Sequence, residues 1–243
     1  MLQEQRLEEV LQLLKNKQVL TSEEMIEYFH VSRDTVRRDF EKLAQANQAK
    51  RVHGGIMRLE NKPVASFNER LQDFNEAKNR IVKLALQLIE VNGIYFFDVS
   101  TTVLKLAQLL DTKTIVYTHS LDNSIMLSDN SSVDLHTLGG KFFSRNRFFY
   151  SINETQFLED ISFDVAFIGA AGLKNNRVTF ADQEDAAVKK LALKHAKVKV
   201  LLAENTKFSK ESTYSIGNLS DFDYLITDKE PAAKIKSLVK VKY

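Results

Sequence analysis

Residues 32–55 constrain the fold of this chain of 243 residues more than any other stretch. Their first part, SRDTVRRDFEKL, spaces Val36, Phe40 and Leu43 at intervals of four and three, so these apolar side chains share one face of a short helix. The basic side chains of this helix are expected to point away from that face, namely Arg33, Arg37 and Arg38. The pattern indicates a helix that packs on one side and presents positive charge on the other.

A small basic hairpin follows this helix. KRVHGG at residues 50–55 has the composition of a strand that meets a tight reversal, for which glycine supplies the backbone freedom. Two amphipathic helices are expected upstream, one over 3–15 and one opening at Thr21, three residues before Glu24 in the spacing of a capping box. Three helices followed by a hairpin form a winged helix-turn-helix, an arrangement that binds double-stranded DNA.

The chemistry of the third helix suits the major groove, because arginines near its start reach guanine edges and hydroxyls contact phosphate or base. Between residues 32 and 58 seven Lys and Arg stand against three Asp and Glu, although ten balance ten over the first 60 residues. The alternative is that these arginines only solvate a helix face, but the adjoining hairpin favours a DNA interface. The residues predicted to contact DNA are Ser32, Arg33, Thr35, Arg37, Arg38, Arg51, His53 and Gly54.

Boundaries can also be predicted. Ser32 is expected to cap the third helix and Asn47 to end it, since asparagine tolerates the left-handed conformation of a C-cap. Hydrophobic periodicity breaks near Pro63. We therefore expect a DNA-binding domain over residues 1–60, a linker over 61–76 and a larger domain over 77–243.

The larger domain alternates strand and helix patterns, which predicts an α/β layer fold with a mostly parallel sheet. Helices are expected over residues 77–90, 103–110 and 184–196. Short apolar runs suited to buried strands lie at 94–97, 114–117, 133–138, 165–169, 198–203 and 224–227.

Polar residues and glycines follow several of these strands. Residues 98–102, DVSTT, lie between a strand and a helix, where backbone N–H groups and hydroxyls can hold an anion. Glycines follow two further strands at Gly139, Gly140 and Gly169, and Lys207 follows another. Each signal alone has an ordinary explanation as a cap, a turn or a surface lysine. Because the carboxyl ends of parallel strands share one edge, together they predict a phosphate pocket beside an acid for sugar hydroxyls.

Other classes of site find no support. The chain has no cysteine, which excludes disulfides and thiolate metal sites, and its five histidines show no metal-ligand spacing. The glycine spacing matches neither a P-loop nor a dinucleotide-binding fingerprint, so no cofactor is expected. No apolar run approaches the roughly 18 to 20 residues that span a bilayer, and no secretion signal is evident, so no membrane contact and a cytoplasmic location are expected.

The run SRDTVRRD at 32–39, the RVHGG block at 51–55 and the early Arg6 resemble the DeoR family of bacterial repressors. The resemblance continues through DVSTT, the glycine pair at 139–140, FDVAFIGAAG at 163–172, EDAAVK at 184–189 and the segment from Lys207. It implies an α/β effector domain similar to ribose-5-phosphate isomerase and glucosamine-6-phosphate deaminase, in a family that senses phosphorylated sugars. It further implies phosphate contacts from Ser100, Thr101, Thr102 and Lys207, and sugar contacts from Asp98 and Glu184.

The function expected on these grounds is a DNA-binding transcriptional regulator, a repressor of sugar metabolism genes that a phosphorylated sugar releases from its operator. Such a protein is expected to form a homo-oligomer, either a dimer or a tetramer. One alternative is a sugar-phosphate isomerase or deaminase with an appended DNA-binding module, using Asp98, Asp182 and Glu184 as acid–base groups. Another is a DNA-binding protein whose pocket has decayed, because Ser100 stands where the family usually has glycine.

Overall fold

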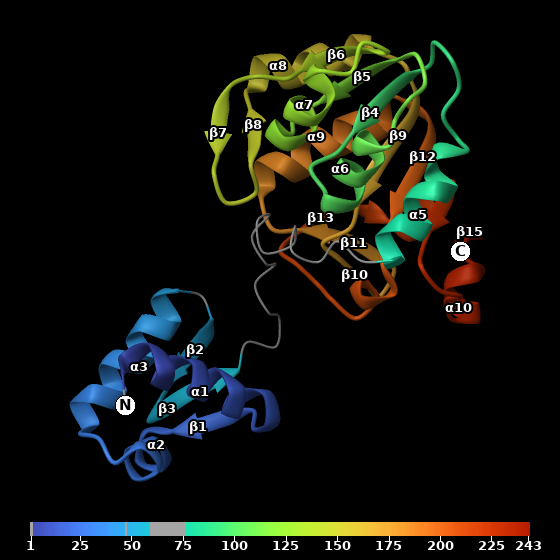
Figure 1. Cartoon of the computed structure of the whole chain (residues 1–243). Coiled ribbons are helices and arrows are strands. Elements are labelled where there is room, and N and C mark those ends of the chain that lie inside the picture. Colours follow the sequence, from blue (N-terminus) through green and yellow to red (C-terminus); the bar gives the residue numbers. More distant parts are fainter. Residues whose placement is uncertain (1, 47, 59–75) are drawn as a thin grey trace. The chain divides into compact units, whose positions relative to one another are not determined.

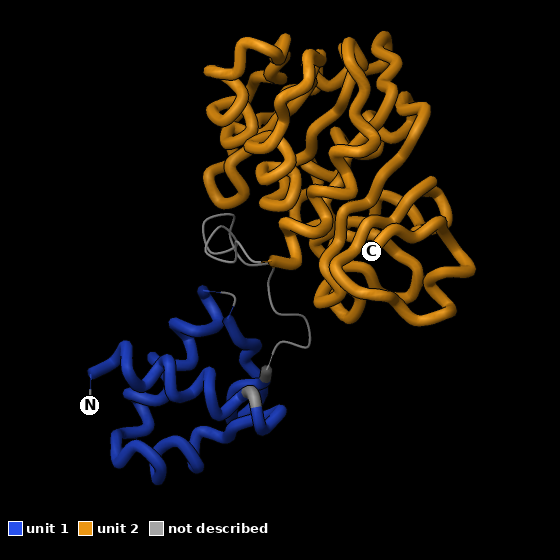
Figure 2. Tube along the Cα trace, turned by 45° about the vertical axis from the view of Figure 1, so that its right-hand side comes forward, with its two compact units in different colours: residues 1–63 blue, residues 64–243 orange. Residues whose placement is uncertain are grey.

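A computed structural model describes residues 2–46, 48–58 and 76–243 (Figure 1). The chain divides into two compact units, Met1–Pro63 and Val64–Tyr243, which are coloured separately in Figure 2. The third helix, predicted to end near Asn47, ends at Gln45 with Ala46 as its C-cap. Asn47 itself, and all but the last residue of the linker predicted over 61–76, lie outside the described residues.

In its described residues, 2–46 and 48–58, the N-terminal unit contains three helices and a small antiparallel sheet, as predicted for a winged helix-turn-helix. Its helices are α1 (Gln3–Asn16), α2 (Ser22–Phe29) and α3 (Arg33–Gln45). Its sheet has the strand order β1-β3-β2, with β1 (Val19–Thr21), β2 (Ala49–Val52) and β3 (Gly55–Arg58). The strand β1 had no counterpart in the sequence prediction.

The predicted N-caps of α2 and α3 are confirmed. Thr21 and Glu24 form the capping box, in which the Glu24 amide donates to Thr21 Oγ1 at 3.2 Å and the Thr21 amide donates to Glu24 Oε2 at 2.8 Å. Ser32 caps α3, since its Oγ accepts a hydrogen bond from the Thr35 amide at 3.2 Å. These contacts satisfy amides that have no partner inside the helix.

The core of this unit forms where the apolar faces of the helices meet the sheet. Val36, Phe40 and Leu43 of α3 are buried, as their spacing predicted, together with Val10 of α1 and Ile56 of β3. The sheet closes tightly over this core, because a Cβ added at Gly55 would lie only 2.4 Å from the Leu20 carbonyl oxygen.

The C-terminal unit is built on a seven-stranded sheet with the order β15-β14-β12-β9-β4-β5-β6, and all of its strand pairs are parallel. The α/β prediction is therefore confirmed. The strands are β4 (Ile94–Phe97), β5 (Thr114–Thr118), β6 (Val133–Thr137), β9 (Phe163–Gly169), β12 (Ala196–Leu202), β14 (Tyr224–Ile226) and β15 (Lys240–Lys242).

Helices cover both faces of this sheet. One core joins Tyr95 and Phe97 to α5 (Glu76–Leu86), α6 (Thr101–Gln108) and α7 (Leu121–Ser128). The other joins Phe96 to α9 (Gln183–Lys194). The alternation along β4 follows from the two-residue period of a strand, which turns successive side chains to opposite faces.

Smaller elements complete the unit. A hairpin is formed by β7 (Lys141–Phe143) and β8 (Phe148–Tyr150), and a second, antiparallel sheet by β10 (Gly172–Lys174), β11 (Arg177–Phe180) and β13 (Tyr214–Asn218). Two short helices are α8 (Ile152–Phe157) and α10 (Ala233–Lys236), and single turns of 3₁₀ helix lie at Leu158–Asp160, Asn205–Lys207 and Leu219–Asp221. No helix among the described residues is long and apolar enough to cross a membrane.

Most predicted boundaries differ from the observed ones by two residues or fewer, but one helix end was wrong by four. The helix predicted over residues 77–90 ends at Leu86, and turns follow it. The Tyr95 hydroxyl accepts a hydrogen bond from the Glu90 amide at 2.6 Å and lies 3.2 Å from the Glu90 carbonyl oxygen, so a tertiary contact holds this backbone outside a helix. Helical periodicity alone could not reveal that competition.

Candidate DNA interface and anion pocket

The arginines of α3 lie on its solvent side. Arg33, Arg37 and Arg38 are exposed, whereas Val36 and Phe40 of the same helix are buried. The helix therefore has the division into an apolar face and a basic face that its sequence predicted. Packing of the apolar face leaves the guanidinium groups accessible to a partner outside the unit.

Acidic neighbours already pair with two of these arginines. Asp34 lies 3.1 Å from Arg37 Nη2 and 2.6 Å from Arg38 Nη2, and Glu41 lies 2.7 Å from Arg37 Nη1. The hydrogen bond from Arg37 and the charge of Arg38 hold the pKa of the Asp34 carboxyl below its usual value. Because exposed ion pairs of this kind contribute little to stability, the arginines can exchange these partners for DNA at small cost.

The wing predicted from the sequence is present as a two-residue loop between β2 and β3. Gly54 has a φ of 75°, which explains the glycine, and His53 and Gly54 are exposed at the tip. The Arg51 guanidinium lies 5.4 Å from the centroid of the Phe40 ring, so a cation–π contact joins the wing to α3. The hairpin and the recognition helix are thus held together as one surface.

A polar pocket lies where the strands of the parallel sheet end in the C-terminal unit. Its lining consists of Lys78, Ser100, Thr101, Thr102, Ala170, Leu202, Glu204 and Lys207. Four residues predicted to contact phosphate therefore line one pocket, although they come from two segments about a hundred residues apart. We call it the anion pocket.

The electrostatics of the anion pocket favour a negatively charged group. Ser100 is the N-cap of α6, and its Oγ accepts a hydrogen bond from the Thr102 amide at 3.2 Å. The first turn of a helix attracts anions through its amides and its dipole. Lys78 is only 3% exposed, and its Nζ lies 3.8 Å from Glu204 Oε2. Two lysines and one glutamate leave the lining with a formal surplus of positive charge.

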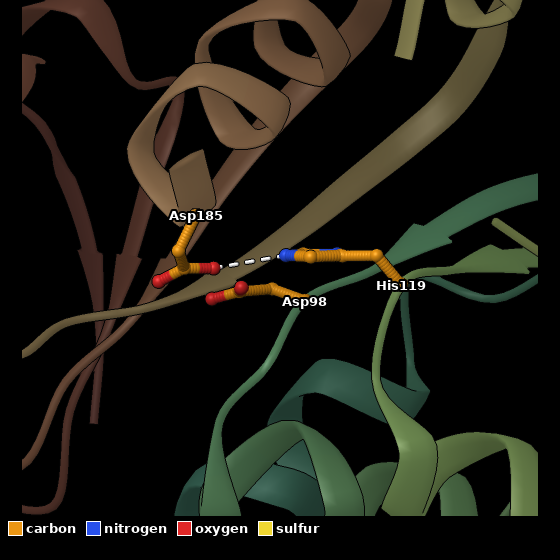
Figure 3. Close-up of side chains that lie close together, drawn as sticks. All are labelled: Asp98, His119 and Asp185. Carbon is orange, nitrogen blue, oxygen red and sulfur yellow. Dashed lines mark hydrogen bonds and ion pairs between the residues drawn. The ribbon is translucent and has the colours of Figure 1, made fainter. Parts of the chain in front are cut away.

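Asp98, predicted to contact sugar hydroxyls, is fully buried and forms internal contacts instead. Its Oδ2 accepts a hydrogen bond from the Gly169 amide at 2.8 Å, and its Oδ1 lies 2.9 Å from Lys189 Nζ. Lys189 Nζ also lies 2.6 Å from Asp185 Oδ2, and Asp185 Oδ1 lies 2.9 Å from His119 Nε2 (Figure 3). Asp98 therefore lines neither the anion pocket nor the cavity next to it, and its contact with sugar hydroxyls stays a prediction.

The pKa values of the two carboxyls in this buried cluster are shifted in opposite directions. Burial raises the pKa of Asp98, and the nearby Lys189 offsets this only in part. Burial also works to raise the pKa of Asp185, but Lys189 and the hydrogen bond with His119 outweigh it and hold that pKa below its usual value. These directions favour the ionised form of Asp185, which lies opposite Lys189. They favour the protonated form for Asp98.

The same cluster has some features of a metal site. Asp98, His119 and Asp185 each offer one ligand atom, and these atoms lie within 4.8 Å of one another. The ammonium group of Lys189, however, contacts the carboxyl groups of both Asp98 and Asp185, so a positive charge already lies against these two groups. These residues therefore fit an internal ion-pair network better than a metal. Asp98, His119 and Asp185 lie far apart in the sequence, so no short metal-binding motif could have revealed this cluster.

A second cavity adjoins the anion pocket, and Ser100 and Ala170 line both. The remaining residues around this second cavity are Val99, Asn146, Gly169, Ala171, Phe180, Ala181, Asp182, Asp185 and Lys189. Asn146 Nδ2 donates a hydrogen bond to Asp182 Oδ2. A Cβ added at Gly169 would lie 2.1 Å from Ser100 Oγ, so this glycine lets the serine approach.

Three other predicted site residues line neither space. Gly139 and Gly140 follow β6, and a Cβ at Gly140, whose φ is 113°, would lie 2.4 Å from the Tyr150 carbonyl oxygen. That glycine therefore serves packing against β8. Glu184 lies on α9 beside Asp185, and it is Asp185 that reaches the second cavity.

Sequence reasoning missed several lining residues that a closer reading of helix periodicity could have found. Lys78 shares the buried face of α5 with Ile81, Val82 and Ala85, so it is a lysine at a core position. Asp185 and Lys189 likewise fall among the buried positions of α9. A charge within an apolar stripe requires a partner, because burying an unpaired charge is costly.

The fold and these surfaces define a class, a DNA-binding regulator with a winged helix-turn-helix and an α/β sensor unit. Residues 6–62 match the DeoR-like helix-turn-helix domain, and residues 73–229 match the DeoR C terminal sensor domain. The chain belongs to the DeoR family of transcriptional regulators.

Relatives match along nearly the whole chain. It is 35% identical over 233 residues to the HTH-type transcriptional repressor GlcR of Bacillus subtilis, covering 95% of this chain and 90% of the relative. It is 31% identical over 245 residues to the lactose phosphotransferase system repressor of Streptococcus mutans, covering 99% and 98%. The glycerol-3-phosphate regulon repressor of Escherichia coli is 24% identical over 244 residues, covering 98% and 96%.

Solved structures resemble the chain more distantly. A D-ribose-5-phosphate isomerase in complex with phospho-erythronic acid has a TM-score of 0.41 at 15% identity, covering 55% of this chain and 53% of the other. The eIF2B beta subunit of Chaetomium thermophilum has a TM-score of 0.45 at 16% identity, covering 70% and 55%. At these values the likeness says nothing about ligand or activity.

Proposed function

We propose that this regulator represses genes of sugar metabolism and that a phosphorylated sugar releases it from its operator. The observation that carries the proposal is the convergence of Lys78, Lys207 and the N-terminus of α6 on one pocket. Such a pocket suits a phosphate group, because it combines helix amides with ammonium groups. The relatives named as repressors of sugar and glycerol-3-phosphate systems support the same function.

Release requires that the effector bind one state of the protein better than the other. A coupling free energy of about 1–3 kcal/mol would change operator affinity by roughly 5- to 150-fold. The effector would obtain this coupling from contacts that differ between the DNA-bound and the free state. A phosphate that competes with Glu204 for Lys78 would provide one such difference, since those two side chains already form an ion pair.

On DNA, α3 would enter the major groove with Arg37 and Arg38, and the wing would contact the backbone or minor groove through Arg51 and His53. We also propose a homo-oligomer, a dimer or a tetramer, because winged-helix readers commonly bind paired half-sites. Since its target is the genome, we place the protein in the cytoplasm. Light scattering coupled to gel filtration would give the number of subunits.

The experiment that tests both units is a gel shift on DNA flanking the gene of this protein. The expected result is a specific complex that at least one member of a panel of sugar phosphates dissociates. A specific complex that no sugar phosphate dissociates would reject effector control while leaving DNA binding in place. If unrelated competitor DNA displaces the protein from this DNA, operator recognition is rejected.

We further propose that the protein is not an enzyme. Of the three acid–base candidates, Asp98 is buried and Glu184 lines neither cavity, which leaves only Asp182 in a lining. The relatives named as repressors agree with a regulatory role. An aldose–ketose conversion assay with purified protein tests the point directly, and turnover of any sugar phosphate that binds would instead establish an isomerase with a DNA-binding module.

A further inference from the structure

The strand β6 forms one end of the seven-stranded sheet, and β15 forms the other (Figure 1). No strand among the described residues pairs with the outer side of β6. Asp134, His136 and Thr137 of this strand are exposed. A free sheet edge is a template for another strand, and natural proteins usually block it. The outer side of β6 is therefore a surface at which a partner strand can bind.

The backbone of β6 alternates between β5 and the free edge. The Ser132 carbonyl accepts a hydrogen bond from β5 at 3.0 Å, and the Leu138 amide donates one to β5 at 2.8 Å. Even-numbered residues therefore bond to β5. Because successive residues of a strand point their backbone groups to opposite sides, Val133, Leu135 and Thr137 turn theirs toward the free edge.

A second copy of β6 fits this edge in an antiparallel register that uses the whole strand. A two-fold axis at Leu135 places Val133 opposite the partner's Thr137. Leu135 then exchanges both of its backbone hydrogen bonds with the partner's Leu135, and each Thr137 amide donates to the carbonyl of Val133 in the other copy. The Val133 amide is not required, because it already donates to the Asn130 carbonyl at 3.0 Å.

The side chains are complementary in the same register. Asp134 lies directly opposite the partner's His136, in a non-hydrogen-bonded pair, the type in which opposing side chains approach most closely. The His136 ring stacks on Tyr117 with centroids 4.4 Å apart, and its Nε2 lies 3.5 Å from Asp134 Oδ1 of the same chain. Two carboxylates and two imidazoles would therefore meet around the axis, and cross-strand pairs of this kind stabilise a sheet.

The opposite edge of the sheet lacks this complementarity. The strand β15 consists of Lys240, Val241 and Lys242. The same two-fold pairing would place Lys240 against the partner's Lys242. Like charges directly opposite each other destabilise a strand pair, and lysine is a usual means of preventing edge pairing. The sequence of β15 thus opposes association with its own copy, whereas the sequence of β6 favours it.

The helix α7 extends the surface beside β6. Ser124 Oγ of α7 and Thr137 Oγ1 of β6 are hydrogen-bonded at 2.8 Å, so this helix lies against the end of the strand. Ile125, the next residue of α7, is 59% exposed. A two-fold axis perpendicular to the sheet places the two α7 helices on the same face, where Ile125 adds apolar surface next to the strand pair.

We propose that β6 is a subunit interface of this regulator and that it pairs antiparallel with β6 of a second copy, about a two-fold axis at Leu135. The contact joins two seven-stranded sheets into one continuous sheet. This inference rests on the proposed homo-oligomer, because it names the surface through which the subunits associate.

The test is sedimentation equilibrium of the full-length protein and its variants, each checked for folding by circular dichroism. His136→Glu places a carboxylate opposite Asp134 at both symmetric positions, so it should weaken association by roughly tenfold or more at low salt. Thr137→Pro removes an outward amide without removing a bond to β5, and it should weaken association as well. Lys240→Glu changes a charge on β15 and is the control that should associate like the wild type.

A mixture of two variants gives the most specific comparison. When the His136→Glu chain pairs with an Asp134→Lys chain, opposite charges meet on one side of the axis and the natural Asp–His pair remains on the other. Neither chain regains the contact between positions 134 and 136 that it had within itself. Recovery of association in the mixture therefore reports pairing between copies, and we expect the mixture to associate more tightly than either variant alone.

The outcomes distinguish this inference from the proposed homo-oligomer. If the wild type is a monomer at every concentration, the homo-oligomer itself is rejected. If the wild type associates, but His136→Glu and Thr137→Pro associate as tightly as Lys240→Glu, another surface joins the subunits and the β6 pairing is rejected. A mixture that associates no more tightly than the separate variants would overturn the register centred on Leu135.

Discussion

Arg6 of α1 donates from Nε to Asp39 Oδ2 of α3 at 2.8 Å, and both side chains are largely buried. Gln3 Nε2 donates to the other oxygen of Asp39, also at 2.8 Å. The last carboxylate of the SRDTVRRD run is thus turned inward, away from any DNA, and joins the recognition helix to the first helix. Its role is to set the orientation of α3.

Asp39→Ala is expected to destabilise the N-terminal unit by about 3–5 kcal/mol, because it leaves the Arg6 guanidinium buried without its carboxylate. Urea denaturation followed by circular dichroism measures the loss. Asp34→Ala is the matched control on the same helix, since its ion pairs are exposed to solvent, and it should change stability far less than Asp39→Ala does. Equal effects of the two substitutions would contradict the structural role of Asp39.

Arg37→Ala and Arg38→Ala should each weaken operator binding by about 1–3 kcal/mol if they contact guanine, with loss of discrimination between operator and random DNA. Gel shifts with both DNAs measure this. Lys190→Ala, which removes an exposed lysine of α9, should leave both affinities unchanged. Normal operator binding by both arginine variants would remove α3 from the interface.

Arg51→Ala should act differently, because a phosphate contact carries no sequence information. We expect weaker binding to all DNA and a salt dependence of log K that is flatter by about 1. Fluorescence anisotropy over a range of salt concentrations gives this slope. An unchanged slope would mean that the contact of Arg51 with Phe40 is its whole role.

Lys207→Ala should leave operator binding intact and abolish release by the effector, because it removes a cation from the anion pocket. Lys210→Ala removes an exposed lysine of the same segment outside that pocket and should respond normally. A gel shift with and without sugar phosphate compares them. Normal release of the Lys207 variant would show that the phosphate binds elsewhere.

Asp98→Asn should gain stability relative to the wild type as pH rises. Burial raises the folded-state pKa of Asp98, so its favourable contribution is complete below the unfolded pKa of about 4 and is lost as pH rises through the folded value. The free energy of unfolding of the variant minus that of the wild type should therefore increase as pH rises from the unfolded pKa of Asp98 to its folded pKa. Thermal unfolding at a series of pH values measures it.

Asp164→Asn provides a control of opposite sign. The hydrogen bonds from Lys197 and the Ile94 amide lower the pKa of Asp164, so its stabilisation is present above the unfolded pKa and is lost as pH falls through the folded value. This variant should differ least from the wild type at low pH. If the Asp98 and Asp164 variants show the same trend with pH, the assignment of a raised pKa to Asp98 is wrong.

Local patterns predicted the elements of this protein because their causes are local. The stripe of Val36, Phe40 and Leu43 and the caps at Thr21 and Ser32 involve residues within a few positions of one another. The main strands of the parallel sheet were likewise evident as apolar runs. Elements such as β15 and the β7–β8 hairpin were missed because a three-residue strand carries little pattern, although β14, which is equally short, was found from its apolar run.

The sequence by itself determined the winged helix-turn-helix, the α/β class and the grouping of Ser100, Thr101, Thr102 and Lys207, since strand ends of a parallel sheet must share an edge. Only the tertiary structure decided which charged groups reach the pockets. Lys78, Asn146 and Asp185 come from distant segments, and Asp98 turned inward to Lys189 rather than outward. The direction of a side chain depends on what packs against it, and that is not encoded in the spacing of its neighbours.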